Sequence, residues 1–448
     1  MKNTEKILSI RGVEKQFGKR GLLGRGRVLH ALGGIDLDVM RGEVLSVVGE
    51  SGSGKSTLGR AILGLCKPEN GRITYYGRSV YEMNPGYLRR LLSGQLIERI
   101  KKKASQGVAD LTPEEQGCLR LLGGFAITED SEIYAGLIRE KARVTSELYR
   151  SNLGGHSEEL ARIDRALGYG ERKHKGDETF DLYHKFIDTG TELNLLTADE
   201  RRRLADEIGI VFQDPYSSLD PRMTAADAIA EGAITHGIIK RGGAEAREYV
   251  TEVARRSGLD PSTLSRFPHQ FSGGQRQRIC IARSLAMKPK LLVLDECISA
   301  LDVSVGAQII SLLLELRAAE GLTYLFISHD LSVVRYISDR VAVMYLGRIV
   351  ELGTTSEIFE DPRHPYTVAL LSSVPSAEGG DDRVILAGSP PSPTAVPNGC
   401  PFHSRCPLAK EVCREQMPRY YEVGAHHRFL CHFPEKKRVK DGSILLDQ

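Results

Sequence analysis

The residues that point most directly to chemistry form a glycine-rich loop near the N-terminus. The loop follows the apolar run 44–48, precedes apolar residues at helical spacing, and reads G-x-x-x-x-G-K-S-T: Gly49, Glu50, Ser51, Gly52, Ser53, Gly54, Lys55, Ser56 and Thr57. Between a strand and a helix, the backbone N–H groups of such a loop surround an anion, and the helix N-terminus adds partial positive charge. This segment, here called the phosphate loop, is predicted to bind a nucleoside triphosphate.

A second apolar run, 291–294, ends in two adjacent carboxylates, Asp295 and Glu296. In nucleotide hydrolysis the lysine of a phosphate loop reaches the β- and γ-phosphates, and the hydroxyl after it ligates Mg²⁺. These roles fall to Lys55 and Ser56. A strand tip holds its side chains rigidly, so we expect Asp295 near Mg²⁺ and Glu296 near the attacking water. Together the two segments predict a Mg²⁺-dependent nucleoside triphosphatase.

A third segment narrows the class. Residues 271–275, Phe-Ser-Gly-Gly-Gln, resemble the L-S-G-G-Q signature of ATP-binding-cassette (ABC) ATPases, with Phe in place of Leu. The positions that match this family, in its order along the chain, are Phe17, Gln213, Ser272, Gly273, Gly274, Gln275, Asp302 and His329. The resemblance covers about residues 7–83 and 206–355. This sequence departs from the family at Cys297, where the family usually has Pro. The Cys297 thiol is interpreted either as a plain buried side chain or as a redox-active group.

The resemblance implies roles for these residues. Phe17 would stack on adenine, Glu296 would act as general base, and His329 would hold the γ-phosphate and the attacking water. Gln213 would ligate Mg²⁺ and sense the γ-phosphate. In this family two cassettes bind head to tail, and the signature of one closes on the ATP in the phosphate loop of the other. The resemblance therefore implies a dimer with ATP at its interface.

Several stretches resemble a subgroup, the oligopeptide and dipeptide importers. They are residues 212–224, 330–340, 364–371 and 399–407, and the first is typical of the second ATPase subunit, which usually pairs with a homologous first one. The resemblance implies two integral membrane permease subunits as partners and an indirect functional link to an extracytoplasmic solute-binding protein. It also implies a peripheral position on the cytoplasmic face of the inner membrane. Nickel importers share much of the pattern. A nickel importer ATPase and a soluble ABC ATPase outside transport remain alternatives.

Four cysteines cluster near the C-terminus: Cys400, Cys406, Cys413 and Cys431. Four thiolates suit tetrahedral Zn²⁺ or an iron–sulfur cluster. The C-x2-C knuckles of structural zinc sites are absent, and the resemblance implies a 4Fe–4S cluster; zinc and no metal stay open. Because these cysteines lie outside the cassette motifs, we expect nucleotide binding to be largely independent of them.

The elements that must position these groups alternate between strand and helix, which predicts an α/β fold with a mainly parallel sheet flanked by helices. We expect an antiparallel β subdomain, a helical subdomain, an all-helical insertion and a small Cys-rich extension. The expected boundaries are 1–83 and 206–360 for the ATPase domain, 84–205 for the insertion and 361–448 for the extension. Within the insertion, Thr112 and Thr197 start capping boxes, and 168–181 reads as a loop. The insertion itself reads as a helical decoration, a docking surface or a ligand site.

Composition bounds the remaining function classes. The 448 residues are 41% apolar and 27% charged, as in soluble globular proteins, and the net charge is only +3. This argues against nucleic-acid binding through bulk charge, so no nucleic-acid partner is expected. No apolar run approaches the roughly 20 residues that span a bilayer, and the polar start lacks a signal core. We therefore expect a cytosolic protein or one held at a membrane by partners.

Overall fold

The computed structural model describes residues 5–18, 28–106, 110–151, 157–373, 390–394, 396–424 and 426–434. The chain forms two compact units. The first comprises Met1–Ile73 and Leu204–Gln448, and the second comprises Thr74–Arg203. Within the described residues, none of the helices combines the length and the apolar character needed to cross a membrane.

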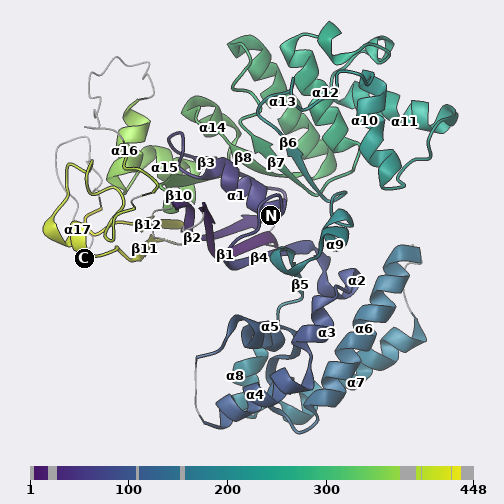
Figure 1. The fold of residues 1–448 in the computed structure, drawn as a ribbon, viewed down its shortest axis with the longest axis vertical. Coiled ribbons are helices and arrows are strands. Elements are labelled where there is room, and N and C mark those ends of the chain that lie inside the picture. The colour runs from purple at the N-terminus through teal and green to yellow at the C-terminus, as the bar shows by residue number, and fades with distance from the viewer. Residues whose placement is uncertain are drawn as a thin grey trace. The chain divides into compact units, whose positions relative to one another are not determined.

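An eight-stranded sheet organises the first unit, in the order β11-β12-β10-β9-β3-β8-β7-β6 (Figure 1). Its strands are β3 (Val44–Val48), β6 (Ile208–Val211), β7 (Leu291–Asp295), β8 (Thr323–Ile327), β9 (Arg340–Tyr345), β10 (Arg348–Thr354), β11 (Tyr420–Val423) and β12 (His427–Leu430). The five strands from β9 to β6 pair in parallel, and the three at the other end are antiparallel. Every residue of β3, β7 and β8 is buried, which explains their unbroken apolar runs. The predicted α/β fold is confirmed.

Helices complete the first unit, and most of them share an apolar core with this sheet. They are α1 (Lys55–Ile62), α10 (Ala225–Thr235), α11 (Gly243–Arg256), α12 (Gly273–Leu285), α13 (Val303–Glu320), α14 (Leu331–Ile337), α15 (Thr355–Glu360), α16 (Pro365–Ser372) and α17 (Glu411–Glu415). One apolar core runs from β3 and β7 through α10, α12 and α13 to the C-terminal residues Cys400 and Phe402. β1 (Lys6–Phe17) and β2 (Leu29–Met40) pair antiparallel and belong to a second, four-stranded sheet in the order β2-β1-β4-β5.

The second unit is helical except for one short pair of strands. β4 (Asn70–Ser79) enters it from the first unit and pairs with β5 (Gly190–Glu192). The prediction of an all-helical insertion missed β5, because three residues give no alternating pattern. Backbone pairing holds β5 instead, together with a hydrogen bond from the Thr191 hydroxyl to the carbonyl of Arg78 (2.8 Å).

The helices of the second unit are α2 (Val80–Met83), α3 (Tyr87–Leu91), α4 (Gly94–Ser105), α5 (Pro113–Leu122), α6 (Ser131–Ser151), α7 (Glu158–His174), α8 (Glu178–His184) and α9 (Ala198–Arg202). Both predicted capping boxes are present, at Thr112 and Thr197. The prediction of a loop over 168–181 is wrong. α7 continues to His174, and Asp177 caps α8; the charged residues that suggested a loop lie largely on exposed parts of these helices.

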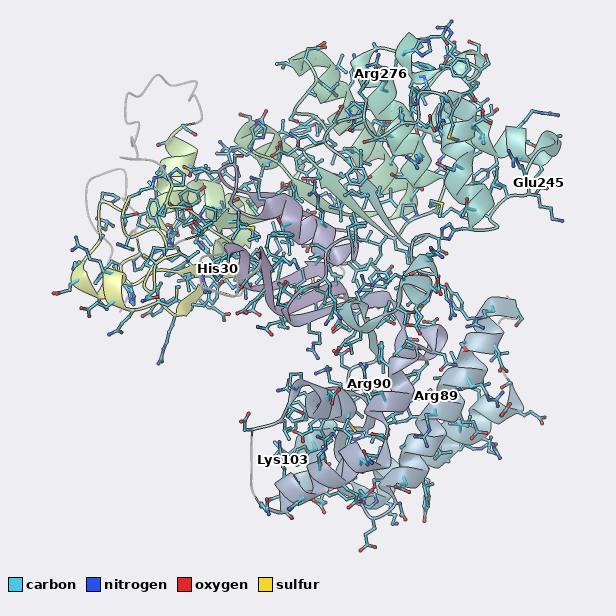
Figure 2. All side chains as sticks on the ribbon, viewed as in Figure 1. His30, Arg89, Arg90, Lys103, Glu245 and Arg276 are labelled. Carbon is cyan, nitrogen blue, oxygen red and sulfur yellow. The ribbon has the colours of Figure 1, made fainter. Side chains whose placement is uncertain are left out.

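An aromatic cluster packs the interior of the second unit. The Phe125 ring stacks on Tyr134 with centroids 4.0 Å apart and meets the Phe180 ring edge-on at 5.3 Å. On α4, Lys103, which Figure 2 labels, pairs with the buried Glu115 at 2.7 Å. That carboxylate also accepts the N–H of Thr112 in the capping box, so this ion pair joins the end of α4 to the start of α5.

Candidate functional site

The phosphate loop has a backbone that only glycine allows at two positions. Gly49 and Gly54 have φ angles of 150° and 103°. A Cβ atom on Gly49 would lie 2.1 Å from the carbonyl oxygen of Met344, and one on Gly54 would lie 2.3 Å from that of Ala31. The loop therefore passes close to backbone on both sides before α1 begins at Lys55, and this fixes where the helix N-terminus points.

Lys55 is buried at the start of α1. Its ammonium group donates to the carbonyl oxygens of Gly49 (2.8 Å) and Glu50 (3.0 Å) and so stays inside the loop. Burial lowers its pKa, while the carboxylates of Glu296, Asp295 and Glu50 act in the opposite direction. A buried cation surrounded by three carboxylates is suited to an anionic ligand that brings its own metal ion.

Ser56 and Asp295 meet as their positions in the sequence predict. The Ser56 hydroxyl donates to the Asp295 carboxylate at 2.8 Å, which joins the start of α1 to the end of β7. Burial raises the pKa of Asp295, so an unpaired carboxylate is costly here and a bound cation would stabilise its charged form. A hydroxyl and a carboxylate side by side are oxygen ligands of the kind that Mg²⁺ takes. The donor set fits the metal.

Glu296 joins three strand ends. Its carboxylate accepts a hydrogen bond from the Gln213 amide (2.9 Å), just beyond β6, and lies 3.4 Å from Nδ1 of His329, just beyond β8. Glu296 itself has a φ of 47°, a conformation that costs a non-glycine residue free energy and that clusters at functional sites. The structure thus brings Gln213 to Glu296, and among the described residues Gln213 makes no hydrogen bond to Ser56 or Asp295.

Cys297 occupies the position where the family usually has proline. Its side chain is buried, and burial raises the pKa of the thiol to about 12. A neutral buried thiol is a poor nucleophile. The structure therefore supports the plain packing role and gives no support to redox chemistry.

The signature residues start α12. The Ser272 hydroxyl accepts the N–H of Gln275, and the Gln275 amide oxygen accepts the N–H of Ser272. Ser272, Gly273 and Gln275 are exposed, whereas Gly274 is buried, and a Cβ on it would lie 2.3 Å from Val305. The guanidinium of Arg276, labelled in Figure 2, lies over the ring of Tyr216 at 5.2 Å. The helix N-terminus is open to a ligand from outside the chain.

Two further residues predicted for the nucleotide site, Asp302 and Phe17, have no contact with the cluster of Lys55, Asp295 and Glu296 among the contacts described above. Asp302 caps α13 by accepting the N–H of Val305 at 3.0 Å. Phe17, at the end of β1, is 44% exposed, with the Lys15 ammonium 5.1 Å from its ring centroid. An exposed ring beside a cation suits stacking against a base carried by phosphates.

Sequence reasoning missed the contacts between the C-terminal extension and the phosphate loop. Arg405 forms two hydrogen bonds to the Glu50 carboxylate, at 2.8 and 3.0 Å, and the Tyr366 hydroxyl accepts the N–H of Glu50 at 2.9 Å. The segment that carries the cysteines therefore contacts the phosphate loop, although its cysteines lie outside the cassette motifs. No motif links these residues, because each contact joins positions far apart in the chain.

The four clustered cysteines line one cavity, together with Phe402 and Phe433. All eight cysteines lie in the described part of the chain, and none of them is in a disulfide bond. Burial raises the pKa of Cys400 to about 11 and that of Cys431 to about 12. Among the described residues, no group of three His, Cys, Asp or Glu is arranged to hold a metal ion. The structure gathers the thiols but does not bring them into a formed metal site.

A glycine-rich loop over a helix N-terminus, a strand-end carboxylate pair and an exposed second helix N-terminus together define a P-loop ATPase cassette. Comparison with known families agrees. The ABC transporter family model matches residues 32–175 and 184–299, and the model of the oligopeptide/dipeptide transporter C-terminal region matches residues 350–413.

Individual relatives extend the match over nearly the whole chain. An oligopeptide transport ATP-binding protein of Bacillus subtilis, AppF, is 37% identical over 96% of this chain and 98% of its own length. A putative peptide import ATP-binding protein of Brucella ovis is 33% identical over 95% and 97%. A dimeric ATP-binding cassette bound to ADP and Pi is 21% identical, covers 78% of this chain and 98% of its own, and has a TM-score of 0.48. The chain belongs to the ABC transporter family of ATP-binding proteins, and it is an ATPase.

Proposed function

We propose that the chain is the ATPase subunit of an importer that takes up oligopeptides or dipeptides. The match of residues 350–413 to the oligopeptide/dipeptide transporter C-terminal region carries this proposal. The two relatives, an oligopeptide transport and a putative peptide import ATP-binding protein, support it. Nickel import is the competing assignment, because nickel importers share much of the sequence pattern.

The chemistry follows from the residues at the strand ends. Glu296 accepts a proton from the attacking water, while Gln213 and His329 hold its carboxylate in position. Lys55 binds the β- and γ-phosphates from within the phosphate loop. Ser56 and Asp295 would hold Mg²⁺, and Gln213 would be a further ligand once its amide leaves Glu296. When bound, Mg²⁺ neutralises the charge that develops on the phosphates.

The proposed partners follow from the nucleotide-binding motifs that the chain carries. It carries one phosphate loop and one signature, so each complete site needs a second ATPase subunit, and we propose a homologous partner in a heterodimer. Two integral membrane permeases would hold the pair on the cytoplasmic face of the inner membrane, and an extracytoplasmic solute-binding protein would deliver the solute. Gln213 would pass the state of the γ-phosphate to the permeases. We propose no nucleic-acid partner.

A reconstituted transporter tests the solute. The complex in lipid vesicles is given solute-binding protein, ATP inside, and radiolabelled dipeptide, oligopeptide or Ni²⁺ outside. Peptide should accumulate and should raise ATP hydrolysis, while Ni²⁺ should do neither. Accumulation of Ni²⁺ without peptide would assign the nickel function. ATP hydrolysis that never responds to either solute, or to permeases, would favour an ATPase outside transport.

The exposed signature offers a test of the dimer. Gly273→Asp places a carboxylate at the open N-terminus of α12, where a Cβ meets only ordinary contact with Leu301 (3.5 Å). Gly274→Asp is less useful, because Val305 leaves no room for its Cβ. We expect Gly273→Asp to leave ATP affinity at the chain's own loop unchanged and to block hydrolysis at the partner's loop by charge repulsion. Loss of the chain's own ATP binding would refute the head-to-tail arrangement.

We further propose that Cys400, Cys406, Cys413 and Cys431 ligate a 4Fe–4S cluster. Their shared cavity supports this, and the cluster would supply a structural crosslink within the extension. Protein purified without oxygen should contain iron and sulfide and absorb broadly in the visible range. Replacing Cys413 by Ser should remove both elements, whereas Cys66→Ser should not. Zinc without iron, from iron-replete cells, would assign the zinc alternative.

A further inference from the structure

The phosphate loop contains a carboxylate where a polyphosphate must bind. Glu50 directly follows Gly49, and its charge reaches Lys55, the cation that the loop presents to phosphate. A free carboxylate at this position would repel an incoming nucleotide and compete for Lys55. The loop therefore needs a device that neutralises Glu50 and keeps its carboxylate out of the phosphate path.

Arg405 supplies that device from the C-terminal extension. Its two terminal nitrogens donate to the two oxygens of Glu50, at 2.8 and 3.0 Å, and one also reaches the Tyr345 hydroxyl at 3.4 Å. The Arg405 side chain is only 7% exposed. Bidentate Arg–carboxylate pairs are strong and fix direction as well as charge. The pair thus holds the Glu50 side chain toward the extension.

A second contact fixes the backbone of the same residue. The Tyr366 hydroxyl accepts the N–H of Glu50, and the Tyr366 ring is buried against Tyr345 (centroids 4.6 Å apart) and Phe402 (5.4 Å). Phe402 belongs to the segment between Cys400 and Cys406, and Arg405 precedes Cys406. One packed cluster in the extension therefore anchors both the backbone and the side chain of a phosphate-loop residue.

We propose that Arg405 is a positioning residue for nucleotide binding: it neutralises Glu50 and holds the opening turn of the phosphate loop in its ATP-receptive form. The extension thus forms part of the nucleotide site through Arg405, and ATP affinity depends on the order of the segment that carries the cysteines. This inference rests on the ATPase activity and is independent of the solute that the transporter carries.

The test compares ATP affinity in full-length variants, measured by fluorescence titration with a labelled ATP. Arg405→Ala should weaken binding about tenfold, because it removes a charge-assisted contact and frees a like charge beside the phosphates. Arg405→Lys should weaken binding less, since it keeps the charge but loses the bidentate geometry. In the assembled ATPase, the same order should appear in KM for ATP, with a smaller change in kcat.

A double variant separates positioning from general support of the fold. If Arg405 acts by neutralising Glu50, then Glu50→Gln combined with Arg405→Ala should bind ATP about as well as Glu50→Gln alone, and better than Arg405→Ala. Arg419→Ala, which removes an exposed guanidinium from the same extension, is the matched control and should keep wild-type affinity. Wild-type affinity in Arg405→Ala, or a double variant as weak as Arg405→Ala, would overturn the proposal.

Discussion

Two pairs of buried charged residues, one pair in each compact unit, have different surroundings. In the first unit, the buried Lys55 and Asp295 come from separate elements and lie with Glu296 around one point. In the second unit, the buried Glu115 and Glu200 each close a capping box at the start of their own helix. Buried charges cost free energy unless they are paired. Helix capping gives Glu115 and Glu200 a role in folding. The convergence of Lys55, Asp295 and Glu296 from separate elements instead indicates a binding and catalytic centre.

The largest effect that this comparison predicts is in the first unit. Glu296→Gln should lower ATP turnover about 10²- to 10⁴-fold, the usual contribution of a general base, while ATP affinity is retained because Lys55, Ser56 and Asp295 are unchanged. Steady-state hydrolysis and ATP titration of the assembled ATPase measure both. Glu315→Gln, at an exposed position of α13, is the control. Normal turnover in Glu296→Gln would remove Glu296 from its proposed role.

A core substitution in the second unit should lower stability and leave ATP binding unchanged. Phe125→Ala removes a ring that stacks on Tyr134 and meets Phe180, and such truncations cost about 3–5 kcal/mol. We expect the second unit to unfold at lower denaturant concentration while ATP affinity stays at the wild-type value. Ile133→Ala, at a side chain that is 63% exposed, should change little. Loss of ATP binding with the first unit still folded would show that nucleotide binding also depends on the second unit.

A capping substitution should give the smallest effect. Thr112→Ala removes the hydroxyl that accepts the N–H of Glu115, which should cost about 1 kcal/mol. Ser93→Ala is a matched control, since Ser93 precedes α4 and makes no capping hydrogen bond through its side chain. Denaturant unfolding of the two variants should therefore differ. Equal stabilities would show that the buried Glu115 depends on Lys103 rather than on the cap.

The sequence predicted those parts of the site that are encoded locally. Short stretches of sequence, about a dozen residues each, predict the phosphate loop, the strand that ends in Asp295 and the capped helix at Ser272. This is possible because glycine, apolar and capping patterns are short-range signals. The contact between Glu50 and Arg405 joins positions 355 residues apart, and no local pattern encodes it. β5 and the helices over 168–181 were missed for a related reason, since pairing and helix packing outweighed weak local signals.

The most direct test of the account removes the second unit. Ser79 and Gly190 are register partners in the pairing of β4 with β5, so a short Asn-Gly connection can replace residues 80–189 and close the two strands as a hairpin. ATP affinity of the shortened chain, measured with its melting curve, decides the outcome. We expect wild-type affinity, because every residue assigned here to nucleotide binding lies in the first unit. A folded shortened chain that no longer binds ATP would contradict this expectation.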